Sequence, residues 1–203
     1  GGKVVRIADG YVSEPGGRVI DLKSSFVLPG LIDSHVHLTS QSNPNQRLEE
    51  VTQSSAEQAM VGARYARRTL MAGFTTVADL GGDNDAVFAL RKATAQGDVP
   101  GPRIIAAGSA ISVHGGHGDV NGLREDIMHL LRPNSVCSGA DVIKITATGG
   151  VLSNTAAGLA QQFSQDELNS IVESAHRMGR RVTAHAHGGD GIVSFLKAGG
   201  DSI

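Results

Sequence analysis

Apolar and polar positions follow two periods along this chain, and stretches of one period alternate with stretches of the other. Short apolar runs of strand length occur at 30–38, 74–80, 102–112, 141–148 and 181–187. Between them, apolar residues recur every three to four positions at 46–72, 85–96, 123–131, 165–178 and 191–198. The first pattern predicts buried strands and the second amphipathic helices, with Ser164 as the N-terminal cap of the helix that starts at residue 165. Strands that alternate with helices indicate βαβ units, an α/β fold and a parallel sheet.

The first 26 residues follow another pattern. Residues 3–7 and 18–20 are typical of short strands, and turn residues, Asp9-Gly10 and Pro15-Gly16-Gly17, lie between them. We therefore expect a small β element, part of a sandwich, over 1–26. The first five to six βα units follow over 27–203, and residues 201–203 begin a sixth strand.

Periodicity alone leaves two parallel architectures open, an open doubly wound sheet and a closed barrel. Unusual polar residues follow several different strands, each at or just after the strand's carboxyl end: His35, His37, His117, Lys144 and His185. A (β/α)8 barrel assembles its site from many strands at that end. An open sheet favours one switch point and a glycine-rich phosphate loop after the first strand, and no such loop is visible. We therefore predict a TIM-type (β/α)8 barrel, of which the chain carries the first strand to the start of the sixth.

Composition narrows the partners. The chain has 203 residues, 40% of them hydrophobic, and a formal net charge of −2, which is ordinary for a globular protein. That charge gives no electrostatic case for nucleic acid or an anionic membrane, and no apolar run is long enough to span a bilayer. We expect a small-molecule substrate, with homo-oligomerisation left open. The single cysteine, Cys137, excludes an internal disulfide and fits a reducing compartment, which predicts a cytoplasmic protein.

Two histidines lie at the end of the first predicted strand of the barrel. His35 and His37 are two residues apart, so on an extended strand they point to one side while Val36 points to the other. Two imidazoles on one face can bind a metal ion. The alternative is a polar strand end with two solvated histidines.

Lys144 lies within an apolar run, Val142-Ile143-Lys144-Ile145, typical of a strand that is buried on both faces. An unpaired ammonium group is strongly disfavoured there and tends to lose its proton. One alternative is a lysine that pairs with a carboxylate or reaches solvent. Another is a Schiff-base lysine, which would need no histidines around it.

Two further segments carry histidines. On the last complete strand, Thr183, His185 and His187 share one face, so either histidine could bind a metal. The loop at 112–119 combines His114 and His117 with small residues that let the backbone approach a ligand closely. The alternative for this loop is a glycine-rich segment whose polar residues are merely solvated.

The segment Pro29-Gly30-Leu31-Ile32-Asp33-Ser34-His35-Val36-His37 resembles the first-strand signature of the amidohydrolase superfamily. The 112–119 loop, Lys144 and His185 follow this segment along the chain in the same order as in that superfamily. The resemblance covers about 4–203. The loop and residues 146–153 are similar to the prolidase-like and imidazolonepropionase-related binuclear metal peptidases. We expect the chain to be the N-terminal portion of such an enzyme, inactive as this fragment alone. The sixth-strand histidine and eighth-strand aspartate of the family fall beyond Ile203.

The resemblance implies a hydrolase of amide or peptide bonds, such as a dipeptidase or an N-acyl amino acid hydrolase. Two divalent ions, with zinc as the expected metal, would activate a bridging water. The metal ligands it implies are His35, His37, His185 and Lys144, the last as a carbamate derived from carbon dioxide that bridges the ions. It also implies substrate contacts from His117 and His114, with His117 nearest the chemistry, and from His187, for which a structural role is the alternative. The alternatives are a mononuclear deaminase or imidazolone-type cyclic amidase, whose members lack the lysine, and a non-catalytic relative.

Overall fold

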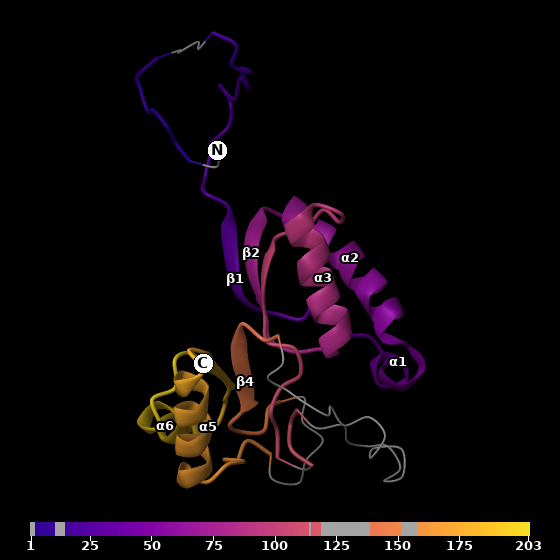
Figure 1. The fold of residues 1–203 in the computed structure, drawn as a ribbon, viewed down its shortest axis with the longest axis vertical. Helices are drawn as coiled ribbons and strands as arrows, with labels where there is room; N and C mark the ends of the chain where they lie inside the picture. The colour runs from indigo at the N-terminus through magenta and orange to yellow at the C-terminus, as the bar shows by residue number, and fades with distance from the viewer. Residues whose placement is uncertain (1–2, 11–14, 114, 119–138, 152–157) are drawn as a thin grey trace.

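The computed structural model of this chain describes residues 3–10, 15–113, 115–118, 139–151 and 158–203. Its strands are β1 (Leu31–Val36), β2 (Phe74–Asp79), β3 (Arg103–Ala106), β4 (Val142–Thr146) and β5 (Arg181–His185). Its helices are α1 (Gln46–Thr52), α2 (Ser55–Met71), α3 (Asn84–Gln96), α5 (Gln165–Arg177) and α6 (Gly189–Lys197). The five strands and most helices predicted from periodicity are confirmed, whereas the helix predicted at 123–131 lies outside the described residues (Figure 1).

All strand pairs are parallel and follow the order of the sequence. One sheet has the order β1-β2-β3, and β4 pairs with β5 in a second sheet. A parallel bridge between Ile111 and Ile145 joins the two sheets, and Ile111 N–H donates to Lys144 O at 2.8 Å. Beyond β5, Ser202 forms a parallel bridge with Thr183, which is where the sixth strand is predicted to begin. An α/β fold with parallel strands is therefore confirmed.

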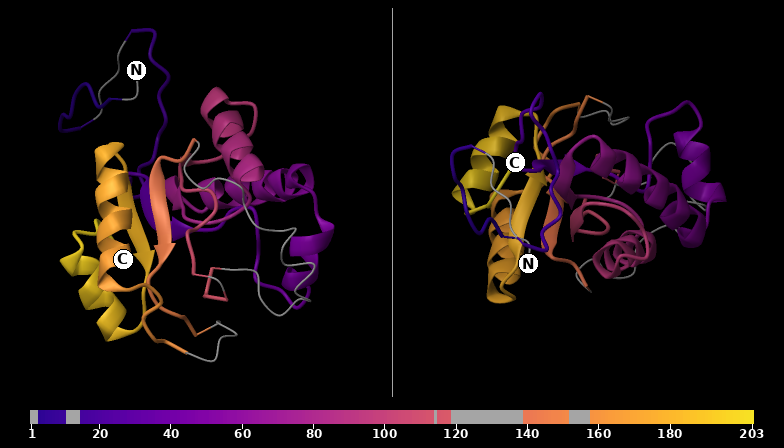
Figure 2. Two further views of the ribbon diagram at one scale, coloured as in Figure 1. Left: turned by 60° about the horizontal axis from the view of Figure 1, so that its bottom comes forward. Right: turned by 90° about the horizontal axis from the view of Figure 1, so that it is seen from above.

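Helices cover one side of each sheet. Helices α2 and α3 pack beside β1–β3, and α5 and α6 pack beside β4 and β5 (Figure 2). Each sheet has its own apolar core, the first around Val77, Val87 and Ile104, the second around Ile145, Leu168 and Phe195. Because strand side chains alternate between faces, the other residues of the same strands point away from the helices. The candidate site lies on that other side.

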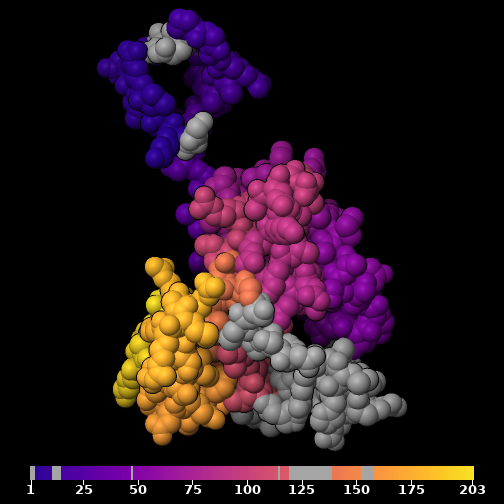
Figure 3. All heavy atoms as spheres, viewed as in Figure 1, coloured from indigo at the N-terminus to yellow at the C-terminus, as the bar shows by residue number. Residues whose placement is uncertain are grey.

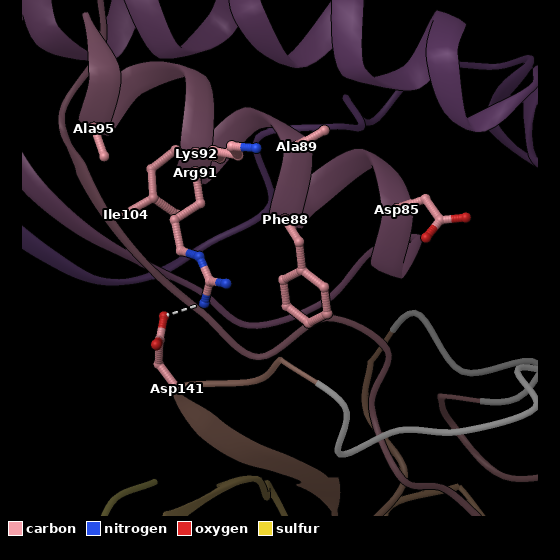
Figure 4. Close-up of a pocket in the computed structure, with 8 residues that line it drawn as sticks. All are labelled: Asp85, Phe88, Ala89, Arg91, Lys92, Ala95, Ile104 and Asp141. Atoms are coloured by element: carbon pink, nitrogen blue, oxygen red, sulfur yellow. Dashed lines mark hydrogen bonds and ion pairs between the residues drawn. The ribbon is translucent and has the colours of Figure 1, made fainter.

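A second contact joins β3 to the start of β4. Asp141 accepts hydrogen bonds from Arg91 Nη1 at 2.6 Å and from Ala106 N at 3.0 Å, and Arg91 also donates to Gly139 O at 2.9 Å. Arg91 belongs to α3, so one carboxylate holds a helix, β3 and β4 together. Arg91 and Asp141 line an open hollow on the outer surface, together with Phe88 (Figure 4). It is lined by none of the predicted site residues, and we interpret it as part of the junction between the sheets.

The single helix predicted at 46–72 is interrupted. Helix α1 ends at Thr52 and α2 begins at Ser55, because Ser54 takes the N-cap position. Ser54 Oγ accepts from Glu57 N at 3.3 Å and Glu57 Oε2 accepts from Ser54 N at 2.8 Å, which is a capping box. The Ser-x-x-Glu spacing in the sequence is the signal that could have located this boundary.

The predicted cap of α5 is confirmed, and it provides a test. Ser164 and Glu167 form a second capping box, with Ser164 Oγ accepting from Glu167 N. We expect Ser164→Ala to lower the free energy of unfolding by about 1 kcal/mol, because one amide at the helix start loses its acceptor. Urea unfolding measures this. Ser170→Ala, at an exposed position inside the same helix, is the matched control and should cost nothing, since alanine favours helix.

The prediction of strands at 3–7 and 18–20 is wrong. In the described residues 3–10 and 15–26 no strand is formed, and Val5 is 97% exposed. Strand geometry needs a neighbouring strand to accept and donate its backbone hydrogen bonds, and none of the described residues offers one. The segment stands away from the packed part of the molecule (Figure 3). The division at residue 26 stays a prediction.

The strand predicted at 102–112 is shorter than expected. β3 ends at Ala106, Gly108 takes a φ of 72°, and Ile111 then pairs with Ile145 of β4 in the second sheet. A left-handed backbone at Gly108 breaks the extended run, because strands need negative φ.

None of the helices in the described part of the chain has the length and apolar character to cross a membrane.

Candidate metal centre

The predicted site residues that the structure describes gather at the carboxyl ends of the strands. His35, Lys144 and His185 belong to β1, β4 and β5, while His37 and His187 follow β1 and β5 directly. His117 lies in the loop between Ile111 and the start of β4. His114 lies outside the described residues. Parallel strands bring their carboxyl ends to one side of the molecule, which is why residues 109 positions apart in sequence meet here.

Lys144 is the central residue of the group. It is 3% exposed, and its Nζ lies 3.0 Å from His35 Nε2, across the junction of the two sheets. No carboxylate among the described residues forms an ion pair with it. Burial lowers the pKa of Lys144 to about 8, so a substantial fraction of the amine is neutral at physiological pH. A solvated surface lysine does not describe this residue.

Two of the surrounding imidazoles, those of His35 and His185, are neutral at physiological pH. Burial, followed by the charge of Lys144, lowers the pKa of His35 to about 4. Burial, followed by the charge on His117, lowers the pKa of His185 to about 4 as well. A neutral imidazole has a nitrogen lone pair that a cation can bind. These two imidazoles therefore offer electron pairs rather than positive charges.

A group of three histidine rings lies on the β5 side of this region. His117 stacks on His185 with the ring centroids 3.9 Å apart, and His187 meets His185 edge-on at 4.9 Å. Burial, followed by the charge of Lys144, lowers the pKa of His117. Sequence alone could not show this stacking, because the two rings come from segments about 70 residues apart. The loop histidine and the strand histidines therefore form one cluster.

His37 is held in a defined orientation. Its Nδ1 lies 2.9 Å from Gly81 O, and since a carbonyl oxygen only accepts, Nδ1 donates this hydrogen bond, which leaves Nε2 as the nitrogen that a metal could bind. Metal-binding histidines are typically oriented by such a bond. His37 and His35 are neighbours, with ring centroids 5.4 Å apart.

Asp79 is a residue of the site that the sequence motifs do not indicate. It ends β2, it is fully buried, and it accepts from Leu38 N at 3.0 Å and from Gly81 N at 3.4 Å. Burial raises the pKa of its carboxyl group. Leu38 is the residue after His37, and Gly81 O accepts the hydrogen bond from the His37 ring. By binding the amides of both residues, Asp79 fixes the backbone on both sides of that imidazole. An acidic residue at the end of the apolar run 74–80 is the signal that could have found it.

The environment of His185 fits a bound metal, but the described residues do not by themselves form a complete metal site. His185 Nε2 is buried and has no hydrogen-bond partner, as expected of an imidazole whose ligand is a cation. A side chain at Gly150 would overlap His185 Nε2 and Cε1, so only glycine leaves room for the imidazole in this position. Among the described residues, however, no three His, Cys, Asp or Glu side chains form a ready metal site. The donors present include a lysine amine, which becomes an oxygen ligand only after modification.

Comparison with known proteins identifies relatives. The family model described as "Amidohydrolase family" matches residues 26–203. Ochratoxinase from Aspergillus niger is 32% identical over 210 residues, which cover 87% of this chain and 42% of the relative. A Xaa-Pro dipeptidase with bound methionine has a TM-score of 0.72 and 34% identity over 86% of this chain and 47% of that chain.

A prolidase complexed with N-methylphosphonate-L-proline has a TM-score of 0.80 and 33% identity, over 96% of this chain and 52% of that chain. The chain thus spans about half the length of the proteins that it resembles. The same holds for an uncharacterized protein of Mycobacterium tuberculosis. It is 28% identical over 97% of this chain, and the match covers 50% of the relative.

Proposed function

The chain belongs to the amidohydrolase family, and from this premise we propose that it forms part of a metal-dependent hydrolase of amide or peptide bonds. The relatives named prolidase, Xaa-Pro dipeptidase and ochratoxinase support this class. The observation that carries the proposal is the buried Lys144 amine 3.0 Å from a neutral imidazole, with the orphaned nitrogen of His185 in the same region. An apolar core would not collect these groups, because each is costly to bury without a ligand.

The strands are those of a barrel in this proposal. Parallel strands in the order of the sequence, with Ser202 pairing beyond β5, match the first part of a (β/α)8 barrel. Such a barrel takes about 250 residues. Its site lies at the carboxyl ends of the strands, which is where His35, Lys144 and His185 are found.

His35, His37, His185 and Lys144 would hold two divalent ions, with zinc as the expected metal. When bound, these ions supply a Lewis acid for the scissile carbonyl and lower the pKa of a coordinated water. The neutral fraction of the Lys144 amine can add carbon dioxide, forming an N–C bond and releasing one proton. The carbamate would offer two oxygens, which share one negative charge, as ligands. This charge would offset part of the charge of the metal ions.

His117 and His187 are the substrate-side groups of this proposal, with His114 as a further candidate. His117 lies against His185, so it can reach a substrate beside the metal ligands. A neutral imidazole can donate to a carboxylate or accept from an amide. Dipeptides and N-acyl amino acids carry both groups, and we propose them as the substrate class. The cytoplasmic localisation rests on the single cysteine and stays a proposal.

The rival functions find no support in the described residues. A mononuclear deaminase or imidazolone-type amidase has no use for a buried lysine beside its first-strand histidine. A non-catalytic relative has no need for His185 Nε2 to stay without a partner. Lys144 and His185 therefore favour the binuclear hydrolase over both.

Chelation tests the proposal. The full-length protein is purified, its metal content is measured, and hydrolysis of a Xaa-Pro dipeptide panel and an N-acyl amino acid panel is followed before and after chelator treatment. We expect about two zinc ions per chain, loss of hydrolysis on chelation and recovery on addition of zinc. Hydrolysis that persists in metal-free protein would falsify the metal-dependent mechanism, and one ion per chain would favour the mononuclear alternative.

A substitution at Gly150 tests the placement of His185. A methyl group there would overlap the imidazole, so Gly150→Ala must displace His185 Nε2. We expect zinc affinity to fall by about 10- to 100-fold, the usual cost of misplacing a ligand. Gly189→Ala is the control, because its added methyl group would meet open space at the start of α6. Equal zinc affinity in both variants would contradict the role of His185.

A further inference from the structure

Two buried side-chain atoms in the described part of the chain have no hydrogen-bond partner, Thr146 Oγ1 and His185 Nε2. They belong to neighbouring residues, because Thr146 and His185 are register partners in the parallel pair β4–β5. Register partners in a sheet point to the same face, and so does Lys144, two residues before Thr146. The unsatisfied hydroxyl therefore faces the same side as the candidate metal ligands.

Two other threonines, Thr183 on β5 and Thr148 just after β4, show what a structural hydroxyl does here. Thr183, the register partner of Lys144, accepts from Ser202 Oγ at 2.9 Å. Thr148, two residues after Thr146, accepts from His187 N and donates to Gly149 O, at 2.8 and 2.7 Å. Buried hydroxyl groups in proteins nearly always find such partners. Thr146, only 2% exposed, differs from both neighbours.

We propose that Thr146 is a binding residue whose hydroxyl donates a hydrogen bond to an oxygen atom held beside His185. This inference rests on the proposed function, because the oxygen is one that a metal would bring there. The oxygen has two possible sources, a bound solvent molecule and an oxygen of the substrate. In both cases the imidazole nitrogen of His185 binds the cation, and the Thr146 hydroxyl donates a hydrogen bond to the oxygen next to it. Thr146 thereby acts on the reacting group without binding the metal itself.

The test compares Thr146→Val, which keeps the shape and removes the hydroxyl, with Thr183→Val, the same change on the adjacent strand. In the metal-free full-length protein, Thr146→Val should melt no lower than the wild type, because it removes an unpaired buried polar atom. Thr183→Val should melt lower, because Ser202 loses its acceptor. Thr146→Ser keeps a hydroxyl and should behave as the wild type.

Binding is then measured with zinc alone and with methylphosphonate, a small oxyanion, on the zinc-loaded protein. Loss of a hydrogen bond to a charged oxygen should weaken binding by about tenfold in Thr146→Val. Thr146→Ser should recover affinity to within about threefold, and Thr183→Val should bind both probes as the wild type does. Weaker zinc binding in the absence of methylphosphonate identifies the oxygen as solvent. Weaker methylphosphonate binding with normal zinc binding identifies it as a substrate oxygen.

Two results would overturn the inference: a melting temperature of Thr146→Val as low as that of Thr183→Val, or unchanged affinity for both probes. A wild type that binds no zinc contradicts the proposed function instead. In that case methylphosphonate binding to the metal-free protein decides the inference: weaker binding by Thr146→Val supports it. An equal or absent response in wild type and variant overturns it.

Discussion

Replacing Lys144 with methionine is expected to lower kcat/KM for the preferred dipeptide by more than about 100-fold and to reduce the bound zinc from about two ions to one or none per chain. Methionine fills a similar volume but can neither form a carbamate nor offer oxygen ligands. The amine is buried beside His35, so the change removes a group that faces the site rather than solvent. Steady-state kinetics and metal analysis of the full-length protein measure both effects.

Lys92→Met is the matched control, because Lys92 is exposed on α3 and should leave kinetics and metal content unchanged. A second variant separates a carbamate from a plain amine. Lys144→Ala leaves room for a small acid, so propionate should restore part of the activity if the native ligand is a carboxylate-like group. Rescue by methylamine instead of propionate would show that the amine itself acts. Full activity of Lys144→Met would remove the basis for a binuclear site.

Replacing Asp79 with alanine is expected to lower the free energy of unfolding by about 2–3 kcal/mol, because the buried amide of Leu38 loses its acceptor and the amide of Gly81 loses a weaker one. The same change should weaken zinc binding by about 10- to 100-fold, since both groups position the backbone around His37. Urea unfolding of the metal-free protein measures the first effect, and zinc titration measures the second.

Asp98→Ala, an exposed aspartate after α3, serves as the control and should stay within about 0.5 kcal/mol of the wild type. Asp79→Asn separates charge from hydrogen bonding, because its amide oxygen can still accept from Leu38 N. We expect it to keep most of the stability. A large loss of stability with normal zinc affinity would show that Asp79 supports the fold but does not orient His37.

Local sequence patterns predicted the strands and helices whose formation depends on residues close together in the sequence. The alternation of apolar runs located β1 to β5, and Ser164 followed by Glu167 located the start of α5. The spacing of His35 and His37 and the apolar run around Lys144 singled out residues that do meet. Their assignment as metal ligands came from the family resemblance and remains a proposal.

Features that depend on distant partners escaped prediction. The strands at 3–7 and 18–20 needed a neighbouring strand that no described residue provides, so β propensity alone was misleading there. Asp79 acts through two backbone amides that only the folded chain brings to it. The missing partner of Thr146 is likewise a property of packing, because a threonine in an apolar strand looks the same in sequence whether or not its hydroxyl is paired.

The junction between the two sheets has a mechanical consequence. His35 is carried by one sheet and Lys144 by the other, and the contact between them crosses a seam closed by the Ile111 bridge and by Arg91 and Asp141. Any slippage along that seam changes the separation of the two side chains directly. Arg91 lies on the outer surface and is none of the candidate site residues, yet its bond to Asp141 helps to hold the two sheets together. Substitutions at Arg91 or Asp141 can therefore alter the spacing of His35 and Lys144 while every residue of the candidate site stays the same.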